Sequence, residues 1–190
     1  HNRLREILPY HTGGRLLEIG CGTGGFIDLA ARQFEVECMD VSAYAVNRLA
    51  ARFGARARQG NVEEVTMPFE RYDVIAAYNV LEHLRLPGIV LQKIFYSLKP
   101  GGIVTGSFPN NFGLVGGLHT ALTNLVDHTH VSTYGPARWR RLFAEANFSP
   151  VSFFGEVVMG HNNSLNVHHP AWPYLSFNLM FVAVKGEPAR

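Results

Sequence analysis

The sequence predicts an α/β fold in which helices cover both faces of a mostly parallel sheet. Between residues 15 and 108, short apolar segments alternate with segments of helical character, and this alternation is typical of a doubly wound parallel sheet. Near the C-terminus, two strand-like segments at 151–156 and 176–186 have no helix between them. We therefore expect this terminal pair to be antiparallel.

The predicted elements follow one another in a regular order. A helix over 3–8 ends at Pro9, and strands are expected at 15–20, 36–41, 55–60, 72–80 and 102–108. Helices are expected at 24–34, 43–53, 88–98 and 137–148. The helix over 43–53 has a typical N-cap in Ser42 and a typical stop in Gly54.

The composition is that of an ordinary globular domain. The chain has 190 residues, of which 47% are hydrophobic and 17% are charged, enough for one domain with a sizeable core. The net charge of +2 favours neither a nucleic-acid partner nor an anionic membrane, and no apolar run approaches the ~18 residues of a membrane span. Cys21 and Cys38 do not suggest a disulfide framework, so we expect a cytoplasmic protein.

We expect a single domain over residues 1–190. The first residue is His1 rather than Met, which leaves room for a missing N-terminal segment. Two stretches, 109–135 and 157–175, are polar and rich in Gly, Asn, His or Pro. We expect them to be loops that cover the substrate.

A glycine-rich stretch, LLEIGCGTGG at 16–25, follows the first predicted strand. It contains a GxGxG and also a GxGxxG, the dinucleotide fingerprint. Ligands of such sheets bind outside the carboxyl ends of the strands, and a helix that begins there directs free N–H groups at the ligand. The loop is therefore the expected cofactor site.

Four features favour S-adenosylmethionine over a dinucleotide at this loop: three polar residues, and LKPGG before the fifth strand together with the expected antiparallel C-terminal pair. Glu18 precedes the first glycine by two residues, and a carboxylate there suits a ligand with a cationic amine rather than a pyrophosphate. Asp40 ends the second strand, where it can accept both ribose hydroxyls, as an acid also does in NAD enzymes. Asn61 follows the third strand, where its oxygen could accept from the adenine amino group.

Four motifs in order resemble the class I S-adenosylmethionine-dependent methyltransferases that act on small molecules: LLEIGCGTGG, VECMDVS, YDVIAAYNVLEHL and SLKPGG. The resemblance covers residues 15–108. It implies a Rossmann-like, doubly wound, seven-stranded sheet, mostly parallel with an antiparallel C-terminal strand. It also implies methyl transfer to a small-molecule acceptor, with S-adenosylhomocysteine as the product.

The resemblance further implies the cofactor contacts. The methionine part would lie against Glu18, Gly20, Cys21, Gly22, Gly24, Asn79 and Val80. The ribose and adenine would be held by Asp40, Val41, Asn61 and Val62. The family often has Asp where Asn61 stands, and Asn keeps the accepting oxygen but loses the charge.

The stretch DHTHVSTYG at 127–135 is the candidate for acceptor chemistry. His128 and His130 titrate near neutral pH and suit a general base, and Asp127 could orient one imidazole. Similar Asp-x-Thr-His-Val stretches occur in many family members, which places His130 slightly ahead. The alternative is that these residues cap the following helix and fix the loop.

The remaining histidines do not predict a metal site. His83 is a family feature that lies near the cofactor or has a structural role. His161, His168 and His169 have no tight carboxylate or Cys pairing, so no metal is expected.

Two other functions stay open at this point. An NAD(P)-dependent oxidoreductase would use the GxGxxG but gives Glu18 no role. A non-catalytic S-adenosylmethionine-binding regulatory module is only mildly disfavoured by the intact motifs. A nucleic-acid acceptor ranks lower, because Asn79-Val80-Leu81-Glu82 replaces the Asn/Asp-Pro-Pro-Tyr run and there is no basic stripe.

Overall fold

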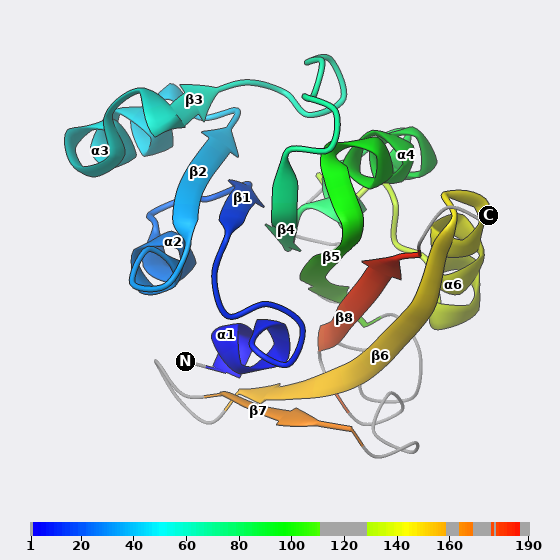
Figure 1. Cartoon of the computed structure of the whole chain (residues 1–190). Coiled ribbons are helices and arrows are strands. Elements are labelled where there is room, and N and C mark those ends of the chain that lie inside the picture. Colours follow the sequence, from blue (N-terminus) through cyan, green and yellow to red (C-terminus); the bar gives the residue numbers. More distant parts are fainter. Residues whose placement is uncertain (1, 111–128, 159–163, 169–175, 177, 187–190) are drawn as a thin grey trace.

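The computed structural model describes residues 2–110, 129–158, 164–168, 176 and 178–186. Within them the chain forms an eight-stranded mixed sheet with helices on both faces (Figure 1). The strand order is β3-β2-β1-β4-β5-β8-β6-β7. The predicted doubly wound α/β class is confirmed.

The parallel part of the sheet contains the first five strands: β1 (Arg15–Ile19), β2 (Glu35–Asp40), β3 (Ala57–Gln59), β4 (Tyr72–Tyr78) and β5 (Leu98–Pro109). β1 pairs with β2 on one side and with β4 on the other. The chain order reverses between β1 and β4, and such a switch point is where open α/β sheets bind their ligands.

The antiparallel part contains β6 (Phe148–Val158), β7 (Ser164–Val167) and β8 (Asn178–Lys185). β8 pairs antiparallel with both β5 and β6. The predicted antiparallel pairing of the last two strand segments is thus confirmed.

β7 lies inside the segment 157–175 that was expected to be a loop, so the sheet has one strand more than expected. β6 runs to Val158, beyond its predicted end at 156, and the returning residues pair with its outer edge from Val158↔Ser164 to Gly155↔Val167. The sequence SLNV alternates polar and apolar residues, but four residues are too few for this alternation to stand out within a polar, proline-bearing stretch.

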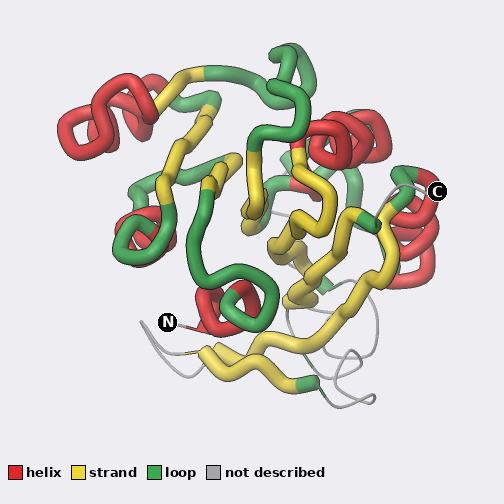
Figure 2. Tube along the Cα trace, viewed as in Figure 1, coloured by secondary structure: helices red, strands yellow, loops and turns green. Residues whose placement is uncertain are grey.

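The helices form two layers (Figure 2). On one face lie α1 (Asn2–Ile7), α2 (Gly25–Ala30) and α3 (Ala43–Phe53), and on the other lie α4 (Pro87–Ser97) and α6 (Pro136–Glu145). Alternate residues of β1 serve the two layers, with Leu16 in one core and Leu17 in the other. A central strand buried on both faces explains the continuous apolar run of the sequence.

The predicted ends of α3 are confirmed. The Ser42 hydroxyl accepts from the Ala45 amide at 3.3 Å, and Gly54 follows the helix with a φ of 57°. Two short 3-10 turns, Gly54–Arg56 and Leu81–His83 (η2), complete the connections. Within the described part of the chain, no helix combines the length and the apolar character that crossing a membrane requires.

Candidate active site

A cleft of about 410 Å³ lies at the carboxyl ends of β1, β2 and β4. Seven residues that the sequence assigned to the cofactor line it together: Gly20, Asp40, Val41, Asn61, Val62, Asn79 and Val80. The same cleft is lined by Ile19, Met39, Gly60, Glu63, His83 and Leu84. Five of these six residues were not predicted from the sequence: Ile19, Met39, Gly60, Glu63 and Leu84. Each of the five is adjacent in sequence to a residue that was singled out.

The glycine loop takes a path that side chains would block. Gly20 has a φ of 72°, and a Cβ there would lie 2.4 Å from Cγ2 of Val80. Gly24, which precedes α2, has a φ of 90°, and its Cβ would lie 2.4 Å from Cδ2 of Leu49. Bare backbone thus lets the loop pass close over the strand ends and leaves the cleft open.

Asp40 is held in place by backbone amides at the mouth of the cleft. Its Oδ2 accepts from the Gly22 amide at 2.9 Å, and its Oδ1 accepts from the Ser42 amide at 2.8 Å. A carboxylate oxygen can accept more than one hydrogen bond. Both oxygens can therefore still accept hydroxyl groups from a ligand in the cleft.

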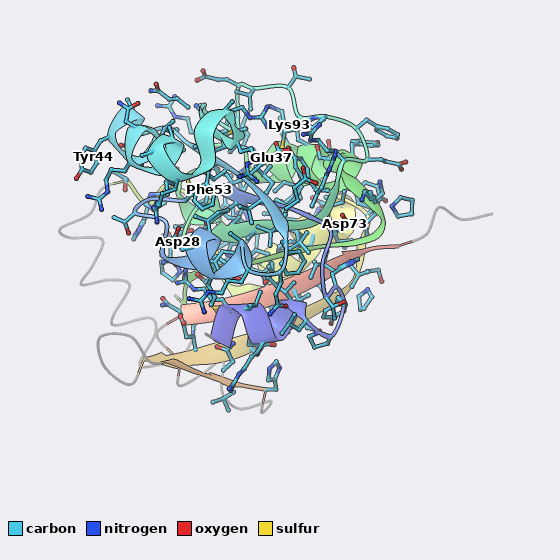
Figure 3. The ribbon with its side chains drawn as sticks, turned by 60° about the vertical axis from the view of Figure 1, so that its left-hand side comes forward. Asp28, Glu37, Tyr44, Phe53, Asp73 and Lys93 are labelled. Carbon is cyan, nitrogen blue, oxygen red and sulfur yellow. The ribbon has the colours of Figure 1, made fainter. Side chains whose placement is uncertain are left out.

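Asn61 shapes a turn beside the cleft. Its side-chain oxygen accepts from the Glu63 amide at 3.0 Å, and its Nδ2 donates to Glu64 at 2.9 Å. Lys93 of α4 fixes the same turn by donating to the carbonyls of Val62, Glu63 and Val65 at 2.6–3.2 Å (Figure 3). The turn therefore forms a fixed wall of the cleft, and the Asn61 oxygen, which accepts one hydrogen bond, can accept a second.

Asn79 ends β4 in a left-handed conformation, with a φ of 53°. Its amide donates to the Ser107 carbonyl at 2.9 Å, and its Oδ1 accepts from the Ser107 hydroxyl at 3.0 Å. These two contacts fix the side chain at the rim of the cleft. Its Nδ2 is the group that remains to donate to a ligand.

Glu18, Cys21, Gly22 and Gly24 do not line this cleft. The Glu18 side chain is 4% exposed and lies behind the loop, on the face that carries α1 and α2. Burial raises the pKa of Glu18 to about 8, and the positive charge of Arg3 offsets part of this effect. One oxygen meets the backbone of Ile27, while Oε2 has no hydrogen-bond partner among the described residues.

Cys21 is buried and faces the second cysteine. Its thiol shares a hydrogen bond with Cys38, and this contact, with burial, raises the pKa of Cys21. A neutral, buried thiol is a poor nucleophile. Its place is in the packing of the loop.

The second rim of the cleft is built by two segments far apart in sequence. The amides of Val131 and Ser132 donate to the Glu82 carbonyl at 3.0 and 2.8 Å, and the Ser132 hydroxyl donates to the Leu84 carbonyl at 2.6 Å. These bonds clamp the chain after Thr129 onto η2. His130 is brought beside His83, with their ring centroids 4.8 Å apart.

His83 connects this rim to the cleft, which it lines. Its Nδ1 lies 3.2 Å from the Thr129 carbonyl and 3.0 Å from the Thr129 hydroxyl. A carbonyl only accepts, so this contact assigns the proton to Nδ1 and the lone pair to Nε2.

The structure therefore places predicted His130 at the rim, beside His83 and Glu82. The ligand atoms of these three side chains lie within 4.8 Å of one another. Asp127 and His128 lie outside the described residues, as do His161 and His169. Glu82 was not predicted as a site residue. The sequence signal that could have identified it is its position next to His83 in the LEH run after the fourth strand.

Comparisons with known proteins agree with this geometry. A family model described as a methyltransferase domain matches residues 1–152. The chain is 32% identical over 125 residues to a probable S-adenosylmethionine-dependent methyltransferase of Mycolicibacterium smegmatis, which covers 64% of this chain and 49% of that protein. It is 34% identical over 104 residues to a ubiquinone biosynthesis O-methyltransferase of Nitrobacter winogradskyi, which covers 52% of this chain and 40% of that protein.

Solved structures share the fold. A methyltransferase from Archaeoglobus fulgidus, described as dependent on S-adenosylmethionine, superimposes with a TM-score of 0.75 at 19% identity, covering 97% of this chain and 92% of that one. The chain spans half or less of the length of the two curated relatives named above.

Proposed function

The chain belongs to the class I S-adenosylmethionine-dependent methyltransferases, and on that premise we propose that it transfers a methyl group to a small-molecule acceptor. The observation that carries this proposal is the cleft at the β1/β4 switch point, with Asp40 fixed at its mouth by two amides. The O-methyltransferase likeness supports a small acceptor.

In the proposed complex the nucleoside lies in the cleft. Asp40 accepts the ribose hydroxyls, and the side chains of Val41 and Val62 pack against the adenine. Asn61 fixes the turn beside the adenine through its contacts with Glu63 and Glu64. The second lone pair of the Asn61 oxygen can accept from the adenine amino group, which is the direct contact that the sequence suggested.

The methionine part lies over the glycine loop. Gly20 and Val80 lie at its border, and the side-chain amide nitrogen of Asn79 donates a hydrogen bond to it. Gly22, Gly24 and Cys21 give the loop its path. Glu18 supplies, from behind the loop, the negative charge that the ammonium group of the cofactor requires, and it must lose a proton to do so because its pKa is about 8 in the empty protein.

Methyl transfer then needs alignment more than activation. The acceptor atom attacks the methyl carbon in line with the departing sulfur, and holding the two in place can supply on the order of 7–11 kcal/mol. The acceptor approaches from the rim of His83 and His130. Asp127 and His128 belong to the same stretch of sequence, and we propose that they take part in the acceptor chemistry with His130.

Calorimetry tests the cofactor assignment. We expect S-adenosylhomocysteine to bind and NAD not to bind, and we expect Asp40→Asn to weaken binding at least about tenfold because hydrogen bonds to a carboxylate are worth ~1.5–3 kcal/mol each. Glu35→Gln, at the other end of β2, is the matched control and should bind like the wild type. NAD binding without S-adenosylhomocysteine binding would instead support the oxidoreductase.

Turnover tests the catalytic assignment. The chain is incubated with S-adenosylmethionine and a panel of small hydroxyl, carboxyl and amine compounds, and release of S-adenosylhomocysteine is measured. Release with at least one compound is the expected result. Tight cofactor binding with no release across the panel would favour the non-catalytic module.

A further inference from the structure

We propose that Glu82, His83 and His130 form a binding site for one divalent transition-metal ion at the acceptor rim of the cleft. The inference rests on the proposed function, since it assigns the ion to the acceptor side of that same site. The three residues come from two segments, η2 and the stretch after Thr129. Backbone hydrogen bonds to the Glu82 carbonyl hold the two segments together.

The three side chains already stand close to metal geometry. Their ligand atoms all lie within 4.8 Å of one another. Donors that bind zinc at about 2.0–2.2 Å in a tetrahedron lie roughly 3.4 Å apart. Side-chain rotations that shorten the longest separation by about 1.4 Å would bring all three donors onto one ion.

The donor set matches a known class of ion. Two imidazoles and one carboxylate are the ligands of catalytic zinc sites that keep a further position open for water or substrate. His83 carries the outer contact that such ligands use, because its Nδ1 donates to the Thr129 carbonyl and leaves Nε2 as the ligand atom.

The burial of Glu82 supports a cation at this place. Its side chain belongs to a residue that is 1% exposed, whereas His83 is exposed to the cleft and His130 is half-buried. A carboxylate at that depth loses hydration and is stabilised by a bound cation. Solvent exposure therefore increases from Glu82 in the protein interior, through His130, to His83 at the cleft.

The ion would act on an oxygen acceptor. A hydroxyl bound at the open position loses its proton to water more readily, because the ion stabilises the oxyanion. The oxygen then forms a bond to the methyl carbon, the carbon–sulfur bond breaks, and its electron pair returns to sulfur to give neutral S-adenosylhomocysteine. The site therefore predicts hydroxyl-bearing acceptors over amines.

Metal titration tests the site without relying on turnover. The purified chain is stripped with a chelator and titrated with Zn²⁺ by calorimetry, and with Co²⁺ by visible absorption. We expect one ion per chain with a tetrahedral cobalt spectrum, and we expect His130→Ala and Glu82→Gln to weaken binding at least about tenfold. Because Glu82 is buried, folding of its variant is checked by circular dichroism, and His83→Ala is the second test of the same ligand set.

His168→Ala is the matched control. His168 also faces a carboxylate, Glu6, at 3.2 Å, but it lies by β7 at the far edge of the sheet. Its variant should bind the ion like the wild type. Equal zinc and cobalt binding in the wild type, His83→Ala and His130→Ala would overturn the proposal, and so would a loss that His168→Ala shares.

S-adenosylhomocysteine binding is measured on the same samples. If the nucleoside binds and the ions do not, the metal site is wrong and the proposed function stands. If the nucleoside does not bind either, the proposed function itself fails.

Discussion

Two buried carboxylates on adjacent strands, Glu18 of β1 and Glu37 of β2, have opposite electrostatic environments. Their neighbours in the ladder are Glu18↔Cys38 and Leu17↔Glu37, so the two side chains point to opposite faces of the sheet. The two residues are almost equally buried, at 4% and 6% exposed. They differ in two ways: Glu18 lies deeper in the protein and loses more hydration, and Glu37 has more hydrogen-bond donors around it.

Glu37 is surrounded by donors. Arg71 Nε donates to it at 3.1 Å and the Tyr72 hydroxyl at 3.0 Å, and Arg58 adds a second ion pair. Burial alone would raise the pKa of Glu37, but the hydrogen bonds from Arg71 and Tyr72 and the charges of both arginines hold it below its usual value. Figure 3 labels Glu37 on the ribbon. This carboxylate stabilises the fold.

Glu18 lacks such partners and has a raised pKa. A charge that is costly in the empty protein becomes favourable when a cation arrives. Under the proposed function, the unsatisfied oxygen of Glu18 supplies charge for the cofactor, whereas Glu37, with its full set of donors, stabilises the fold. Four experiments test the difference between the two carboxylates.

The largest expected effect is on the pH dependence of stability. The folded pKa of Glu18 lies near 8, above its ordinary 4.5, so its ionisation makes the folded state progressively less stable as pH rises between these values. Glu18→Gln should therefore be more stable than the wild type at pH 8 by on the order of a few kcal/mol, and nearly equal at pH 4.5. Urea unfolding at the two pH values measures both differences.

Glu37 should show the reverse sign. Its folded pKa is lowered, so the stability that Glu37 contributes is present above pH 4.5 and is lost as pH falls through the folded pKa.

The Glu18 prediction is contradicted if the stability of Glu18→Gln falls with rising pH as steeply as that of the wild type.

The second effect is on cofactor affinity. Removing the Glu18 charge deprives the ammonium group of its counter-charge, and such buried pairs are worth about 2–5 kcal/mol. We expect Glu18→Gln to weaken S-adenosylhomocysteine binding roughly 100-fold by calorimetry at pH 7.5. Glu37→Gln, once shown to be folded, is the control and should bind normally. Equal losses in both variants would mean that the two carboxylates do not differ in role.

The third effect is on stability at neutral pH. Glu37→Gln leaves Arg58 and Arg71 without their shared partner. Because their side chains are 50% and 39% exposed, solvent screens the loss, and we expect a destabilisation of about 1–2 kcal/mol. Thermal unfolding at pH 7 measures this value. A variant as stable as the wild type would show that the network contributes nothing.

The smallest effect concerns Arg3 of α1, whose charge partly offsets the raised pKa of Glu18. Its guanidinium also lies 4.2 Å above the Tyr78 ring. Arg3→Gln should raise the pKa of Glu18 further and weaken S-adenosylhomocysteine binding a few-fold at pH 7. Arg5→Gln on the same helix is the control, and equal affinities of these two variants would exclude a role for Arg3.

Local sequence patterns predicted the parallel half of the fold and several residues that line the cleft. Asp40 ends β2 and Asn79 follows β4, and both could be placed because strand ends in a parallel sheet meet at one edge. The glycine loop could be predicted from its GxGxG pattern. The structure gives the physical reason for that pattern, because the loop path forbids a Cβ at Gly20 and Gly24.

The acceptor side could not be predicted in the same way. Glu82 and His130 are 48 residues apart in the sequence, and they meet because the Val131 and Ser132 amides donate to the Glu82 carbonyl. No local periodicity records such a contact. β7 was missed for a related reason, because its pairing depends on how far β6 extends.

Proton release on cofactor binding tests the role of Glu18 most directly. Calorimetric titration of S-adenosylhomocysteine at pH 6.5 in buffers of different ionisation enthalpy gives the number of protons released. Because Glu18 is protonated in the empty protein and must be charged against the ammonium group, close to one proton should leave per ligand bound, and close to none in Glu18→Gln. Tight binding by the wild type with no proton release would show that Glu18 does not ionise when the cofactor binds.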